Sequence, residues 1–116
     1  MVTYDESERN NCQFIVLELD ESVALMNRDQ LVQILQSENV LARRYFYPGC
    51  HRMQPYSSLY PEAGMDLLET KKLSRRLIAL PSGTAIDVET IKEICQIIRI
   101  TVLNATDVSK RLNRTV

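Results

Sequence analysis

This chain of 116 residues is poor in the residues that build metal centres, disulfide frameworks and catalytic pairs. It has one histidine and three cysteines, at positions 12, 50 and 95, and no Cys-x-x-Cys pair, so no zinc site can be read from their spacing. A nucleophile needs a base and an orienting group beside it, and no such arrangement is recognisable. We expect no catalytic residue, no metal site, no cofactor site, and cysteines that stay reduced.

The chain also lacks an excess of charge and a long apolar run. Its 14 basic and 15 acidic residues give a net charge of −1, whereas duplex-binding proteins carry a basic excess or stripe. No apolar run approaches the roughly 20 residues of a membrane span. The opening segment, MVTYDESERNN, is polar and acidic, unlike a secretory signal. We expect a cytoplasmic protein without a nucleic-acid or membrane partner.

Hydrophobic patterning and capping signals predict an α/β (α+β) fold. A small mixed sheet is covered by helices in the order β-α-β-loop-α-β-α. The domain should span residues 13–105, after a polar lead-in over 1–12, which the family resemblance given below implies is an interdomain junction, and before a polar, frayed tail over 106–116. The predicted elements are strands at 13–19, 40–47 and 77–80, helices at 27–38, 67–77 and 87–102, and a long loop at 48–64.

The last of these helices carries an apolar stripe with helical spacing. Ile91, Ile94, Cys95, Ile98 and Val102 recur at i, i+3, i+4, i+7 and i+11. We therefore expect Cys95 to lie in the core as a small hydrophobic side chain.

The segment ARRYFYPGCHRMQPYSS, residues 42–58, is the strongest candidate for a binding site. Alternation along a strand places Arg43 with Tyr45 and Tyr47 on one face, and Arg44 with Phe46 on the other. Phe46 and Ala42 form the more apolar face, which should pack on the protein. The exposed face would then offer a guanidinium and two phenols to an anion. The competing interpretation is that the arginines are solvated and the tyrosines pack against the loop.

Several motifs together resemble the small C-terminal domain of the DegT/DnrJ/EryC1/StrS aminotransferases. They are the Arg-Tyr-Phe-Tyr-Pro stretch followed by His51, the LIALPSG turn at 77–83, and the helix DVETIKEIC at 87–95. The first strand and the NRDQLVQIL helix also follow in the family's order, so that the resemblance covers about residues 13–100. It implies the small domain of a pyridoxal-phosphate enzyme that aminates nucleotide-linked keto sugars.

The resemblance also implies particular residues and partners. Substrate contact is carried over to Arg44, Tyr47 and His51, and more weakly to Tyr45. The first three should lie together at one end of the sheet. The parent enzyme would add a large domain that binds pyridoxal phosphate, so this chain alone should be inactive and bind no cofactor. Its uncovered interdomain face should cause self-association. The alternative is a stand-alone α/β ligand-binding or regulatory module for an anionic effector.

Overall fold

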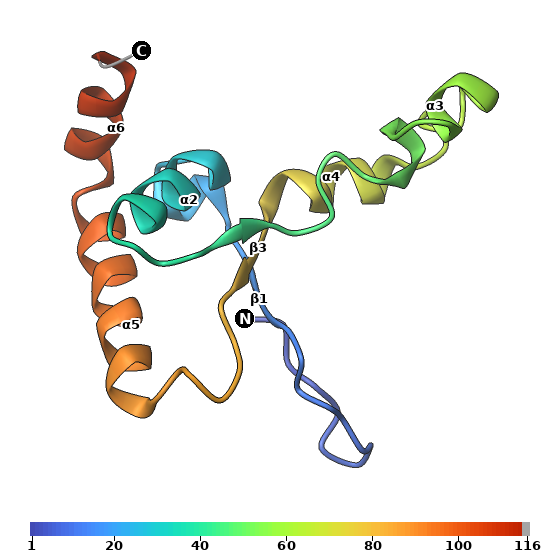
Figure 1. Ribbon diagram of the computed structural model, residues 1–116. Helices are drawn as coiled ribbons and strands as arrows, with labels where there is room; N and C mark the ends of the chain where they lie inside the picture. Colours follow the sequence, from blue (N-terminus) through green and yellow to red (C-terminus); the bar gives the residue numbers. More distant parts are fainter. Residues whose placement is uncertain (115–116) are drawn as a thin grey trace.

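A computed structural model describes residues 1–114, and its elements follow one another with short connections except around the arm of residues 49–66 (Figure 1). The strands are β1 (Ile15–Glu18), β2 (Arg43–Arg44) and β3 (Leu77–Leu80). The helices are α1 (Glu21–Ala24), α2 (Arg28–Ser37), the 3-10 turn η1 (Cys50–Arg52), α3 (Tyr56–Leu59), α4 (Leu68–Arg76), α5 (Val88–Leu103) and α6 (Ala105–Arg114).

The sheet has three strands in the order β1-β3-β2, and both pairings are antiparallel. The predicted α/β class is confirmed, but the predicted mixed sheet is wrong. β1 and β2 are joined through helices, a connection that would suit parallel neighbours. However, β3 lies between them, with Ile78 opposite both Leu17 and Arg44. The two strands therefore never pair with each other.

The core lies between one face of the sheet and helices α2 and α5. Leu31 and Leu35 of α2 and Ile78 of β3 are essentially fully buried, and Ile94 of α5 joins them. Helix α2 begins where the sequence predicts, because Asn27 and Gln30 form the reciprocal capping box. Local sequence signals thus set the start of the helix that carries much of the core.

Helix α5 begins at its predicted cap, where the Asp87 carboxylate accepts the backbone N–H of Thr90 at 2.8 Å. This hydrogen bond is the main cause that lowers the pKa of Asp87 below its usual 3.8. The predicted burial of Cys95 is wrong: Cys95 is exposed while its neighbour Ile94 is buried. The apolar stripe is wider than the surface that α2 presents to α5, so its outer members face solvent.

The predicted frayed tail is also wrong for residues 106–114, which belong to helix α6, whereas residues 115–116 lie outside the described part. Ala105 is buried and Val108 packs against the core, so the helix is held by tertiary contacts. Asp107 in its first turn and Arg111 and Arg114 in its last turn complement the helix dipole. Polar composition alone concealed this amphipathic helix.

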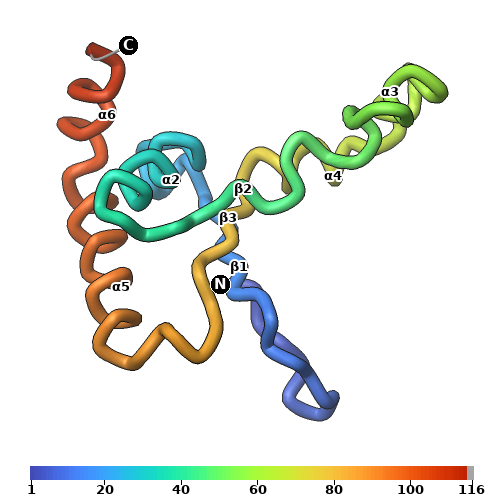
Figure 2. Tube along the Cα trace, viewed as in Figure 1, coloured from blue at the N-terminus to red at the C-terminus, as the bar shows by residue number. Residues whose placement is uncertain are grey.

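Two segments project away from the core (Figure 2). Residues 1–14 fold back along β1, where the Val2 N–H donates to the Val16 carbonyl at 3.0 Å. The arm of residues 49–66 extends on the opposite side from α5 and α6 and exposes Tyr60 and Met65. The radius of gyration is 16.2 Å, whereas a compact domain of this length has about 13 Å. None of the helices over residues 1–114 is long and apolar enough to cross a membrane.

Candidate functional site

Strand β2 directs Arg44 toward the first turn of α2. Arg44 pairs with Ile78, whose side chain is in the core, so it shares the helix-covered side of the sheet with the buried Ala42. Its Nε lies 3.3 Å from Oδ1 of Asp29, and its side chain is about half exposed. The short strand therefore places a guanidinium at the rim of the sheet, close to a helix start.

Two guanidinium groups flank the ring of Tyr47. The Cζ atoms of Arg28 and Arg44 lie 5.2 and 5.0 Å from the ring centroid, within cation–π range. Arg28 is only 2% exposed; it donates from Nη1 to the Leu77 carbonyl at 2.8 Å and from Nε to Asp29 at 2.6 Å. We call Arg28, Asp29, Arg44 and Tyr47 the Arg–Tyr cluster. It fixes Tyr47 against the sheet edge.

The predicted alternation along 40–47 fails after Arg44. The regular strand spans two residues, and Phe46 has a φ of 48°, in the left-handed region. This backbone turn reverses the expected direction of Phe46, which is 69% exposed instead of packed beside Ala42. The expectation that Phe46 helps to form the covered face is therefore wrong.

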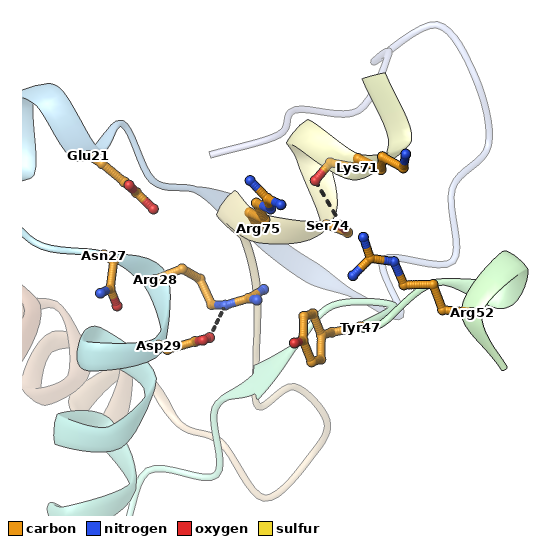
Figure 3. A pocket seen from close by; sticks show the side chains of 9 residues that line it. All are labelled: Glu21, Asn27, Arg28, Asp29, Tyr47, Arg52, Lys71, Ser74 and Arg75. Atoms are coloured by element: carbon orange, nitrogen blue, oxygen red, sulfur yellow. Dashed lines mark hydrogen bonds and ion pairs between the residues drawn. The ribbon is translucent and has the colours of Figure 1, made fainter. Parts of the chain in front are cut away.

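A polar pocket of about 310 Å³ opens beside Tyr47, between the starts of α1 and α2 and the side of α4. We call it the basic pocket, because its lining carries four cationic and two acidic side chains. Figure 3 shows Arg28 and Arg52 reaching toward it from opposite sides, with Arg75 and Lys71 above and Tyr47 below. The other lining residues are Glu21, Asn27, Asp29 and Ser74.

A second pocket, of about 380 Å³, has mostly apolar walls and contains Tyr45 and His51. Two glycines leave room for the imidazole of His51 to lie against the backbone. A methyl carbon built on Gly49 would lie 2.9 Å from His51 Cε1, and one on Gly64 would lie 3.2 Å from Cδ2. Within the described residues the buried Nε2 of His51 has no hydrogen-bond partner. Buried polar atoms are rarely left unsatisfied, so this nitrogen is available to a ligand or another polypeptide.

The structure divides the predicted site into two pairs. Arg44 and Tyr47 are in contact and also line a shared pocket with Arg43, whereas Tyr45 and His51 line the apolar pocket. Five residues that were not predicted from the sequence complete the site: Arg28, Asp29, Arg52, Lys71 and Arg75. A usable signal existed for the last two: they are four residues apart on a predicted helix, and so share one face.

The surroundings of three lysines can be compared with what a pyridoxal-phosphate site requires. Such a site needs a lysine to bind the cofactor and a carboxylate or similar partner for its ring nitrogen. Lys72 and Lys92 are ion-paired with Glu69 and Glu89. Lys71 lines the same pocket as Arg52 and Arg75, and Asp29 of that pocket is engaged by Arg28 and Arg44. Residues 1–114 also contain no group of three histidine, cysteine or carboxylate side chains placed to hold a metal ion.

Comparison with known proteins gives consistent matches. The sequence profile of the DegT/DnrJ/EryC1/StrS aminotransferase family matches residues 1–99. The dTDP-4-amino-4,6-dideoxy-D-glucose transaminase of Escherichia coli is 29% identical over 63% of this chain and 20% of its own length. Its counterpart in Shigella dysenteriae is 28% identical over 70% of this chain and 22% of its own length.

Among solved structures, DesI crystallised in the presence of its TDP-sugar product matches with a TM-score of 0.80 and 34% identity. The match covers 90% of this chain and 26% of the DesI chain. The chain thus spans about a fifth of the length of the curated relatives that it matches.

Proposed function

This chain belongs to the DegT/DnrJ/EryC1/StrS aminotransferase family, and on that premise we propose that it is the small C-terminal domain of a pyridoxal-phosphate-dependent sugar aminotransferase. Its substrate is a nucleotide-linked keto sugar. The observation that carries the proposal is the likeness to DesI, because that structure was obtained with a TDP-sugar and the match covers nearly the whole of this chain. The transaminases named for a dTDP-amino sugar support the same substrate class.

The role of this domain is to supply part of the substrate-binding surface. Arg44 and Tyr47 present a guanidinium and a phenol at the sheet edge, which suits phosphate and sugar hydroxyl groups. Tyr45 and His51 line the neighbouring apolar pocket, where the unsatisfied His51 Nε2 can hydrogen-bond to the substrate. All four residues bind and orient the substrate, and none of them performs the chemical step.

The cofactor belongs to the rest of the parent enzyme. Pyridoxal phosphate supplies the electron sink for amino transfer, and the lysine that holds it lies in the large domain of the parent. The projecting arm and the exposed apolar side chains fit a surface that this large domain covers. In the parent, closure of the small domain over the cofactor would exclude water from the reaction.

A chimera tests this function directly. This chain replaces the matching segment of the Escherichia coli transaminase, and formation of the dTDP-amino sugar is measured. We expect an active chimera in which Arg44→Gln raises the KM for the nucleotide sugar and leaves the cofactor spectrum unchanged. Arg99→Gln is the matched control, since it removes the same charge from an exposed residue of α5 that lines none of the pockets described above. A folded, cofactor-bearing chimera in which the two variants behave alike would refute the role of Arg44.

A second candidate function is a stand-alone module for an anionic effector. The basic pocket favours it, because its four cationic side chains suit an anion. This candidate predicts that the chimera folds and binds its cofactor but transfers no amino group. An active chimera decides against it.

A further inference from the structure

The cations of helix α4 are divided into two pairs with different surroundings. Lys72 and Arg76 have carboxylate partners, at 3.9 Å from Glu69 and from Glu18. Lys71 and Arg75 line the basic pocket, and over residues 1–114 neither side chain has a hydrogen-bonding or ion-pair partner. One face of the helix is thus neutralised by the protein, and the adjacent face is left uncompensated.

A third uncompensated cation reaches the same pocket from a distant part of the chain. Arg52, at the end of η1, lines the pocket, and its guanidinium has no partner within the described residues. The pocket's fourth cation, Arg28, is neutralised by Asp29, which leaves Glu21 as the only opposing carboxylate of the lining. The net charge of the lining is therefore +2. Like charges gathered around one space repel one another, and a bound anion relieves that repulsion.

We propose that the basic pocket binds the diphosphate group of a small molecule through Arg52, Lys71 and Arg75. A diphosphate carries at least two negative charges and several acceptor oxygens, which matches three donors from two segments. Tyr47, Asn27 and Ser74 add uncharged polar side chains to the lining. The volume of about 310 Å³ is small for a ligand site, so the pocket holds the diphosphate and leaves its substituents outside.

The diphosphate could come from a nucleotide or from a free inorganic ion. If it belongs to a nucleotide-linked sugar, the inference rests on the proposed function and adds Arg52, Lys71 and Arg75 to its substrate contacts. The three cations named in the proposal all belong to this chain. The test of the proposal can therefore fail or succeed independently of aminotransferase activity.

The test is calorimetric titration of the full 116-residue chain with inorganic pyrophosphate and, separately, with dTDP. The variant K71Q/R75Q removes two pocket cations. K72Q/R76Q removes the same two residue types from the adjacent face of the same helix. Because a charge-assisted hydrogen bond is a strong contribution, we expect K71Q/R75Q to weaken binding at least about tenfold and the control about twofold or less. Circular dichroism verifies that both variants are folded.

Each outcome is decisive. Equal weakening by the two variants would mean that only the overall charge attracts the anion. Absence of binding by the unmodified chain would mean that there is no site. Either result overturns the proposal. Binding of dTDP that is tighter than that of pyrophosphate, and lost in K71Q/R75Q, supports a nucleotide as the source. Equal binding of both probes, again lost in K71Q/R75Q, supports the diphosphate site but gives no support to the proposed substrate class.

Discussion

Arg28 offers the sharpest test of how the Arg–Tyr cluster is held. It is a buried cation that joins α2 to β3 through the Leu77 carbonyl and to Tyr47 through its guanidinium face. We consider Arg28→Met, which keeps an unbranched stem of similar length but removes the guanidinium with its charge and all donors. The change leaves the Leu77 carbonyl without its side-chain donor and releases Tyr47 from one of its two flanking cations.

The magnitude follows from these losses. Hydrogen bonds from a charged group contribute about 1.5–3 kcal/mol, and a desolvated cation–π contact contributes about 0.5–2 kcal/mol. Removal of a buried charge recovers part of this, because the guanidinium no longer has to be desolvated. We therefore expect the free energy of unfolding to fall by about 2–4 kcal/mol. Arg28→Lys keeps the charge but not the forked geometry, and should give an intermediate loss.

Urea unfolding followed by circular dichroism measures this effect, with an unchanged m-value showing that the same structure unfolds. Arg99→Met on the exposed side of α5 is the matched control and should stay within about 0.5 kcal/mol of the unmodified chain. If Arg28→Met is no more destabilising than Arg99→Met, the cluster does not hold the site in place and this reasoning is refuted.

Three further predictions concern the backbone, pH and association. Gly49→Ala should destabilise the chain by about 2 kcal/mol in urea unfolding, because Gly49 has a φ of 92° and its new methyl group would meet His51; a neutral effect would show that the imidazole is not clamped. The pKa of Asp87 is lowered by the Thr90 N–H, so its stabilising effect is complete above pH 3.8 and is lost as the pH falls through the lowered value. Unfolding midpoints from about pH 5 to pH 2 should therefore fall less steeply in Asp87→Asn, and identical slopes would argue against the cap. Light scattering should detect concentration-dependent self-association through exposed apolar side chains such as Phe46, whereas a strictly monomeric particle would contradict an uncovered interface.

The parts of the fold that could be predicted are those encoded by neighbouring residues. Asn27 with Gln30 and Asp87 with Thr90 set helix starts through hydrogen bonds that span three residues. The strand at 77–80 was predicted at its observed bounds, because an apolar run there is bracketed by a helix end and Pro81. These signals need no knowledge of the tertiary structure.

The missed parts depend on contacts between distant segments. A phenylalanine gives no local sign of a left-handed φ, so the turn at Phe46 that follows the early end of β2 at Arg44 was not predictable. The exposure of Cys95 depends on how much of α5 is covered by α2. The basic pocket combines residues from three segments, and only the Lys71–Arg75 spacing was visible along the chain. The candidate residues were therefore found in part, but their grouping was not.

Because β2 is short, the number of residues between α2 and β2 cannot vary freely. The segment is anchored just before the strand, where the Gln36 side chain donates to the Ala42 carbonyl at 2.9 Å. Because side chains alternate along a strand, one residue inserted between Ala42 and Arg43 would move Arg43 into the position of Arg44 and turn the following residue away from Asp29. Because β2 has only two paired residues, no other part of the strand could keep the original register. Insertions and deletions between α2 and β2 should therefore leave the number of residues unchanged or change it by two.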